Sequence, residues 1–394
     1  MRLKFFLSTL ALMLVLFTIA ANAQPVTAVS EAPKQDPLKV SGRVYLEWAK
    51  TLGNAADEGE NSNSFNVKRV YLDFNRKLDA VWSVRATVDV DNDNVSASDT
   101  RYVAYMKYAY LQALLNLGFG TLRTQFGLVG TPVIDLVDSQ SDYRWLNQNY
   151  IDAAKVILHK QKAADAGKIG QSIDNSADMG VNAALNVAKM VTVSAAITHG
   201  EGYKKTKEDP ASTSSDDGKA FYGMVTVTPI EGLSIAGYVR NQVLRDNGEN
   251  SDDNFSQYYG GTIIYNFQGI RVGASYLMGT ISTNPATVGS DPTVAEYTLL
   301  DVFLMANLNS LTGVPVLIAG RYAMGTTRYD EGYGAGDGFE AQAILWAIGI
   351  GYQVNDNVRF MAYLEDQSST SDDLVAADWE GSNRMFYIKS EARF

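Results

Sequence analysis

The carboxyl-terminal end of the chain alternates between two kinds of side chain at every second position. One set is mostly apolar and ends on the last residue of the chain, and the other set carries the charge. The first set is Phe386, Ile388, Ser390, Ala392 and Phe394, and the second is Met385, Tyr387, Lys389, Glu391 and Arg393. A period of two predicts a β-strand with two unlike faces. The same alternation returns along most of the chain.

About sixteen segments have the length that a tilted membrane-spanning strand needs, roughly 9–11 residues. They are 39–50, 65–77, 81–92, 102–115, 121–127, 178–188, 190–199, 219–228, 232–245, 255–266, 270–280, 294–307, 313–324, 340–352, 357–367 and 383–394. Short turns and longer polar loops alternate between them, as they do in bacterial β-barrels. We therefore predict an all-β fold, a transmembrane antiparallel β-barrel of about sixteen strands, over residues 39–394.

The charged side of each strand indicates which face meets water. In strand 81–92, Val84 and Ala86 oppose Arg85 and Asp89. An Arg or Lys that faced lipid at mid-membrane would cost roughly 2–4 kcal/mol, so the charged faces are expected to line the inside. A soluble barrel would alternate too, but with an apolar interior. The predicted basic pore wall consists of Arg43, Arg69, Arg85, Lys107, Arg123, Arg321 and Arg359.

The amino-terminal end and the composition agree with export to a membrane. Residues 1–23 combine a basic start, an apolar run and the small-x-small pattern Ala21-Asn22-Ala23, which predicts a cleaved signal peptide; an uncleaved anchor is the alternative. Residues 24–38 are predicted to form a flexible amino-terminal extension. A mean hydropathy of -0.12 suits a barrel, in which only alternate residues touch lipid. The net charge of -11 argues against a nucleic-acid partner.

One connection is much longer than the others. About fifty residues, 128–177, follow the fifth strand, and loops of this length are usually functional or disordered. The segment Tyr143 to Ala164 has a helix-compatible composition, and its aromatic and aliphatic side chains need something to pack against. We therefore expect the loop to be partly helical and to fold into the lumen as a constriction loop. The alternatives are that it caps the barrel from outside or contacts a neighbouring subunit.

This loop carries charged candidates that would face the basic wall. They are Asp135, Asp138, Asp142, Arg144, Lys155 and Lys160. Acid on the loop facing base on the wall would create a transverse field, which orients dipolar solutes and rejects apolar ones. Arginines paired with carboxylates of adjacent strands would instead only brace the wall. The opposite charges nearly cancel, so the sequence leaves the sign of ion selectivity open.

Several segments resemble known barrel families. The terminal Phe394 resembles the assembly signal of outer-membrane barrels, which implies recognition by the barrel assembly machinery. Arg69 to Asp91 resembles the second hairpin of the phosphate-selective porin O and P family, and Lys107 to Leu128 resembles its fourth and fifth strands. The stretch Arg144-Trp145-Leu146-Asn147 lies where that family's third loop begins.

This resemblance implies a sixteen-stranded homotrimeric channel whose third loop folds into the barrel. It also implies the outer membrane of a Gram-negative bacterium, with contacts to outer-membrane lipid and lipopolysaccharide. The pattern Arg-Arg-Ala-Arg expected at the second strand is reduced here to Lys68-Arg69. This departure weakens the case for a dedicated ladder of anion sites.

The sequence offers no catalytic constellation. Only two histidines exist, His159 and His199, and no Ser-His-Asp trio can be assembled from the expected strands. We therefore expect no enzyme, no cofactor and no metal site. The favoured function is an outer-membrane porin, a passive diffusion channel for ions and small hydrophilic solutes, for which an anion (phosphate-like) preference is one option. The alternative is a structural or receptor barrel that binds a partner through its outer loops.

Overall fold

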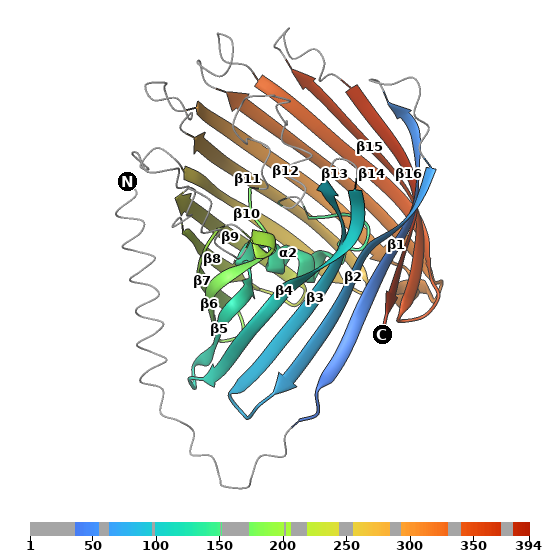
Figure 1. Ribbon diagram of the computed structural model, residues 1–394. Helices are drawn as coiled ribbons and strands as arrows, with labels where there is room; N and C mark the ends of the chain where they lie inside the picture. Colours follow the sequence, from blue (N-terminus) through green and yellow to red (C-terminus); the bar gives the residue numbers. More distant parts are fainter. Residues whose placement is uncertain are drawn as a thin grey trace.

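In the computed structural model, sixteen antiparallel strands close into one barrel within the described residues, which are 36–54, 63–96, 99–149, 151, 173–200, 202–205, 219–243, 255–283, 293–329, 340–371 and 381–394. Each strand pairs with its neighbours in sequence, and β1 pairs with β16 to close the barrel (Figure 1). The predicted all-β barrel is confirmed. The strands are β1 (Lys39–Asn54), β2 (Asn63–Lys77), β3 (Trp82–Ser96), β4 (Asp99–Asn116), β5 (Gly120–Gly130), β6 (Ala177–Val187), β7 (Val191–Thr198), β8 (Ala220–Val227), β9 (Leu233–Val243), β10 (Phe255–Phe267), β11 (Ile270–Thr283), β12 (Thr293–Asn307), β13 (Val316–Tyr329), β14 (Glu340–Gln353), β15 (Val358–Ser371) and β16 (Gly381–Arg393).

Several strands extend further at the long-loop end than the sequence indicates. β3 and β4 form a continuous hairpin that leaves only residues 97–98 between them, where a polar loop over 93–101 is expected from composition. β5 also runs further, to Gly130 and not to residue 127, through the buried apolar residues Leu128 and Val129. In the β3–β4 hairpin the backbone ladder continues through polar residues, because a strand beyond the bilayer can carry polar side chains on both faces. Polarity therefore marks the membrane edge and not the strand end.

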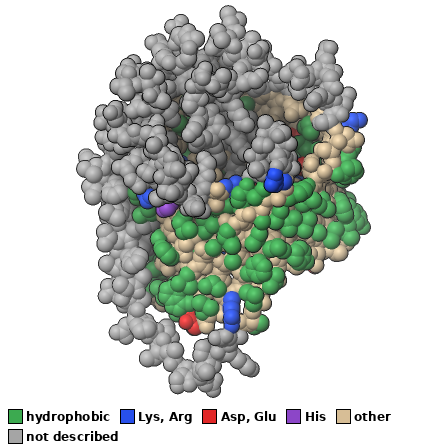
Figure 2. Space-filling model, viewed as in Figure 1, with side chains coloured by type: hydrophobic (Ala, Val, Ile, Leu, Met, Phe, Trp, Pro, Cys, Tyr) green, Lys and Arg blue, Asp and Glu red, His purple; other side chains and the backbone are tan. Residues whose placement is uncertain are grey.

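The outward face of the barrel is apolar, as the alternation predicts. In β14, Trp346, Ile348 and Ile350 are exposed, whereas Leu345 and Ala347, which point to the opposite face, are buried. Hydrophobic side chains cover much of the outer surface in Figure 2, and lysines and arginines lie at its margins. An exposed apolar surface of this extent suits contact with hydrocarbon. No helix in the described part of the chain is long and apolar enough to span a bilayer.

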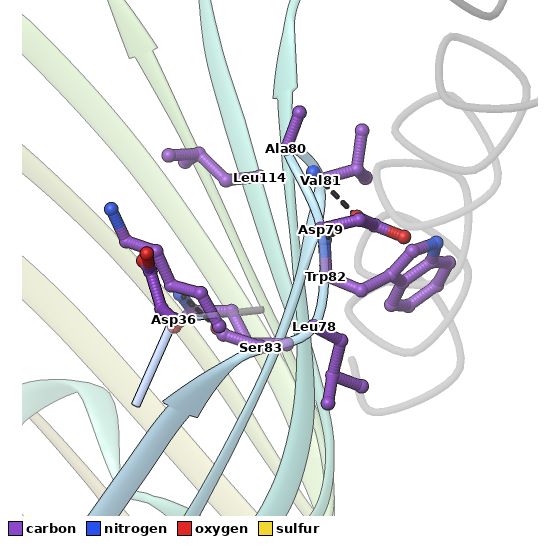
Figure 3. Close-up of a pocket in the computed structure, with 10 residues that line it drawn as sticks. Asp36, Leu78, Asp79, Ala80, Val81, Trp82, Ser83 and Leu114 are labelled. Carbon is purple, nitrogen blue, oxygen red and sulfur yellow. Dashed lines mark hydrogen bonds between the residues drawn. The ribbon is translucent and has the colours of Figure 1, made fainter. Parts of the chain in front are cut away.

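The short turns are closed by local hydrogen bonds. Between β2 and β3, the Asp79 side chain accepts hydrogen bonds from the backbone N–H groups of Val81 (2.8 Å) and Trp82 (2.7 Å), as in an Asx-turn. Figure 3 shows this turn and a small pocket beside it, with Trp82 and Leu114 on opposite sides of the sheet. No predicted site residue lines this pocket.

The interior of the barrel is not polar throughout. Inward side chains of β8 to β15, such as Tyr258, Leu277 and Phe303, are buried in one cluster with Val133 and Ile134 of the connection between β5 and β6. The inward face therefore carries an apolar cluster beside the charges that the alternation predicts there. The connection between β5 and β6 packs against this part of the wall through these apolar side chains.

Candidate functional site

The connection between β5 and β6 enters the barrel, and we call residues 131–176 the inner loop; its described residues are 131–149, 151 and 173–176. It begins with helix α2 (Pro132–Ser141), which contacts β7, β8, β10 and β11. Figure 1 shows α2 within the outline of the barrel. This helix precedes the segment Tyr143 to Ala164 that composition favours as helical; within that segment residues 144–146 form a turn, and residues 150 and 152–164 lie outside the described part.

The sequence of α2 explains where it starts and which face it buries. Pro132 occupies the first helical position, where a fixed φ is favourable and no backbone N–H is needed. Val133, Ile134 and Val137 form one buried stripe against the wall. The helix ends at Asp142, which adopts the left-handed conformation (φ 55°) and turns the chain toward the next wall strands.

The turn after α2 is bound to the wall by several hydrogen bonds. The hydroxyls of Tyr143 and Tyr363 lie 2.7 Å apart, and Asn147 Nδ2 donates to the Glu365 carboxylate at 2.5 Å. Two wall cations donate to backbone carbonyls of the same turn: Arg321 to Gln148 (2.6 Å) and Lys389 to Leu146. Because these contacts come from β13, β15 and β16, the turn is held independently of α2.

Asp142 gathers three arginines from distant strands. Its carboxylate lies 2.6 Å from Arg359 of β15, 2.7 Å from Arg271 of β11 and 3.4 Å from Arg393 of β16. Arg359 and Arg393 also contact the Glu391 carboxylate, at 2.5 and 2.8 Å. Burial alone would favour the neutral acid, but the hydrogen bonds and positive charges of the three arginines hold the pKa of Asp142 below its usual value.

A second carboxylate, Asp174, ties the returning end of the inner loop to the wall. It accepts hydrogen bonds from the hydroxyls of Tyr222 (2.8 Å) and Tyr258 (2.5 Å), and Arg240 Nε lies 3.6 Å away. All four side chains are buried. Burial raises the pKa of Asp174, although Arg240 and the two tyrosines favour its charged form.

The wall formed by β2 to β4 carries its own ion pairs. Arg69 lies 2.5 Å from Asp91 and 3.5 Å from Asp89. Lys107 is the extra residue of a β-bulge, because Tyr108 pairs with Thr87 and Met106 with Val88. The bulge lets Lys107 reach inward, where its Nζ lies 4.0 Å from Asp89.

Asp135, in the first turn of α2, differs from the other described acids of the inner loop. Asp138 lies 3.8 Å from Arg144, and Asp142 and Asp174 have the arginine partners described above. Asp135 makes no ion pair with a described residue, and its hydrogen-bond donor is the Tyr108 hydroxyl at 3.4 Å. Burial raises its pKa to about 6. The positive charges of Arg123, Arg85 and Lys107 act in the opposite direction, and Asp138 adds to the rise.

The structure places all seven predicted wall residues on the inward face, but in different settings. Arg321 and Arg359 are buried in ion pairs, whereas Arg43 and Arg123 are exposed. Of the predicted loop residues, Asp135, Asp138, Asp142 and Arg144 lie inside the barrel, and Lys155 and Lys160 are outside the described residues, as is the predicted signal peptide. Sequence reasoning missed Asp174 and Tyr143 as anchors, since no motif marks either one. No group of described His, Cys, Asp and Glu residues is arranged to hold a metal ion.

Comparisons with known proteins agree with this architecture. OmpT of Vibrio cholerae is 14% identical, with a TM-score of 0.56 over 91% of this chain and 97% of that chain. The outer-membrane channel DcaP of Acinetobacter baumannii is 12% identical, with a TM-score of 0.57 over 93% and 99%. OmpF of Salmonella typhi is 12% identical, with a TM-score of 0.56 over 91% and 97%. At these identities the likeness shows the fold alone. No curated protein sequence matches the chain.

A family model described as Gram-negative porin matches residues 9–372. This match covers most of the chain, and it agrees with the closed barrel, the apolar outer face and the inner loop that follows the fifth strand. The protein is therefore located in the outer membrane of a Gram-negative bacterium. The family match and the fold point to a channel and not to an enzyme. The chain belongs to the Gram-negative porin family.

Proposed function

We propose that the protein is a passive diffusion channel for ions and small hydrophilic solutes, with a preference for anions. One observation carries the anion preference: in five of the six described inward ion pairs near the short-turn end, the arginine is more open to water than its carboxylate, and Arg359–Asp142 is the exception. The Arg393 side chain is 36% exposed and its partner Glu391 only 1%; for Arg85 and Asp73 the values are 32% and 17%. Arg43 and Arg123 are exposed as well.

This difference in exposure matters because a permeating ion meets the accessible charge and not the total charge. A carboxylate sealed behind its arginine contributes to the wall but is screened from solution, whereas an exposed guanidinium raises the local concentration of anions. Arginine stays charged at all physiological pH values and matches the oxygens of carboxylates and phosphates. Among the described residues the balance of accessible inward charge is therefore positive, although the formal charges of the wall and the inner loop together nearly cancel.

The finer features of the family resemblance are part of the proposal. We infer a homotrimer, supported by the trimer form described for OmpT of Vibrio cholerae. Phosphate is a reasonable test solute, given the resemblance of Arg69 to Asp91 to the phosphate-selective porins. Contacts with outer-membrane lipid and lipopolysaccharide, and recognition of Phe394 by the barrel assembly machinery, follow from location and from the exposed terminal ring. The alternative function remains a structural or receptor barrel that acts through its outer loops.

The test is electrical. Purified protein in a planar bilayer is expected to give stepwise currents, and the reversal potential in a KCl gradient is expected to show chloride preference. Arg123→Gln removes an exposed inward charge and should lower the chloride-to-potassium permeability ratio about twofold, as expected for one charge at high dielectric. Arg328→Gln makes the same charge change on the outward face of β13 and should leave the ratio unchanged. Silence would favour the receptor barrel, and potassium preference would refute the proposed sign.

A further inference from the structure

The cluster around Asp142 lies at the short-turn end of the barrel, which is the periplasmic end in outer-membrane barrels. We call Asp142, Arg271, Arg359, Arg393 and Glu391 the Asp142 cluster. Arg271 is the second residue of β11, Arg359 is the second of β15, and Arg393 is the last of β16. All three strands have their short-turn ends at these positions. The cluster therefore stands where the channel opens toward the periplasm.

Two of the three arginines are open to water. The Arg271 and Arg393 side chains are 37% and 36% exposed, whereas Arg359 and Glu391 are buried. Arg359 and Glu391 form a closed pair beneath the surface, at 2.5 Å. An anion that arrives from the periplasm consequently meets Arg271 and Arg393 first.

The cluster has more positive than negative charge. Three guanidiniums face the two carboxylates of Asp142 and Glu391. Arg43 adds to the excess, because it is exposed and pairs in register with Arg393 across the β1–β16 seam. The Asp142 carboxylate itself shows that the arginines can bind a carboxylate presented to them, since hydrogen bonds from two Arg359 nitrogens reach it at 2.6 and 2.9 Å.

Release of Asp142 would not release the whole inner loop. The turn that follows is held by the Tyr143–Tyr363 and Asn147–Glu365 hydrogen bonds, and the far end of the loop is held by Asp174. The carboxylate of Asp142 can therefore be replaced locally by a carboxylate from solution while α2 stays in place.

We propose that the Asp142 cluster is a binding site for small multivalent carboxylates that enter from the periplasmic end. One carboxylate of the ligand binds Arg271 and Arg393 in place of the Asp142 carboxylate, and a second carboxylate pairs with Arg43. This inference rests on the proposed channel function and adds to it a ligand class and a side of entry. It predicts that such anions block the channel more strongly from one side of the membrane.

Citrate is the probe, added to one side or the other of bilayers in which all channels share one orientation. Leu311→Cys identifies the periplasmic side through a membrane-impermeant thiol label, because Leu311 is exposed on the turn after β12 and the native chain has no cysteine. Citrate at the periplasmic side should block the wild-type channel at concentrations about tenfold lower than at the outer side. This size is typical of a few charge-assisted hydrogen bonds.

Two sets of variants separate the site from general charge effects. The double variant Arg271→Gln/Arg393→Gln should abolish the sidedness, and Asp142→Asn, which frees the arginines, should strengthen the block about tenfold. Arg328→Gln should change nothing. Calorimetric titration of citrate into the detergent-solubilised protein should give the same ranking of affinities without requiring a current.

The outcomes distinguish this inference from the proposed function. Equal block from both sides, or a block unchanged in the double variant, overturns the citrate site even if the channel conducts with anion preference. An absence of conductance in KCl overturns the channel, and calorimetry then decides the site by itself: the expected ranking supports it, and no citrate binding rejects it.

Discussion

Gly42 is where the carboxyl-terminal residue closes the barrel seam. The backbone of Gly42 exchanges two hydrogen bonds with Phe394, at 2.8 and 3.1 Å, and the Phe394 ring lies over the space where a Cβ at position 42 would be. An added Cβ would stand 2.8 Å from Phe394 Cε2, closer still to Cζ, and 2.8 Å from the Tyr71 carbonyl oxygen. Position 42 faces outward, so the space left by the missing side chain is occupied by the Phe394 ring on the outside of the barrel and does not widen the lumen.

Gly42→Ala is therefore expected to destabilise the barrel. Overpacking by one methyl group typically costs about 1–3 kcal/mol when neighbours must shift. Two neighbours must shift here, the aromatic ring and a backbone carbonyl. The ring can rotate away because Phe394 is 64% exposed, but the carbonyl belongs to β2 and can give little. We expect a loss of about 2 kcal/mol in the wild-type background, and about half of it where Phe394→Ala has already removed the ring.

The assay is urea unfolding and refolding in detergent micelles, followed by tryptophan fluorescence, for both single variants and the double variant. Gly320→Ala is the matched control, since a Cβ built at this β13 position meets no atom within 4 Å. It should be neutral or slightly stabilising, because alanine restricts the unfolded chain. The reasoning is refuted if Gly42→Ala behaves like Gly320→Ala, or if its cost is the same with and without the Phe394 ring.

Two further predictions concern the inner loop. Because the pKa of Asp135 is raised to about 6, its carboxylate takes up a proton as the pH falls from 7 to 5. The loss of this negative charge beside Arg123, Arg85 and Lys107 should increase the chloride preference of the channel, with a midpoint near pH 6. Asp135→Asn should remove this pH-dependent step in the reversal potential. Arg240→Gln should lower the free energy of unfolding by about 3–5 kcal/mol, since it removes the buried Arg240 charge from beside the buried Asp174 carboxylate. The double variant with Asp174→Asn should recover much of that loss, as measured by the urea midpoint.

The strands were predictable because their signal is local. The alternation in segments such as 81–92 and 357–367 requires no knowledge of the rest of the chain, and the cost of placing arginine in lipid selects which face turns inward. The inner loop was predictable only in outline. Its length after the fifth strand indicates a special role, and composition favoured a helix over Tyr143 to Ala164, but it did not indicate α2, which starts at Pro132. The dipeptide Thr131-Pro132, typical of a helix start, was the available signal.

The anchors could not be read from the sequence for a different reason. Asp174 meets Arg240 and Tyr258 across 66 and 84 residues of chain, and such a contact depends on the path of the loop through the lumen. Tyr143 and Tyr363 are still further apart, with 220 residues between them. A residue's type does not reveal its partner when both partners are brought together by a third element.

The sequence alone determined the barrel, its approximate strand number and the inward direction of its charges. When polar and apolar side chains alternate along strands that are surrounded by hydrocarbon, only one orientation of the two faces has a low free energy. Only the tertiary structure decided which of those charges meet water. Arg359 and Arg123 look alike in the sequence, yet the first is sealed against Asp142, Glu391 and Trp145 and the second stays exposed. The difference arises because the inner loop covers one part of the wall and leaves the other open, and electrostatic strength depends on that exposure to solvent.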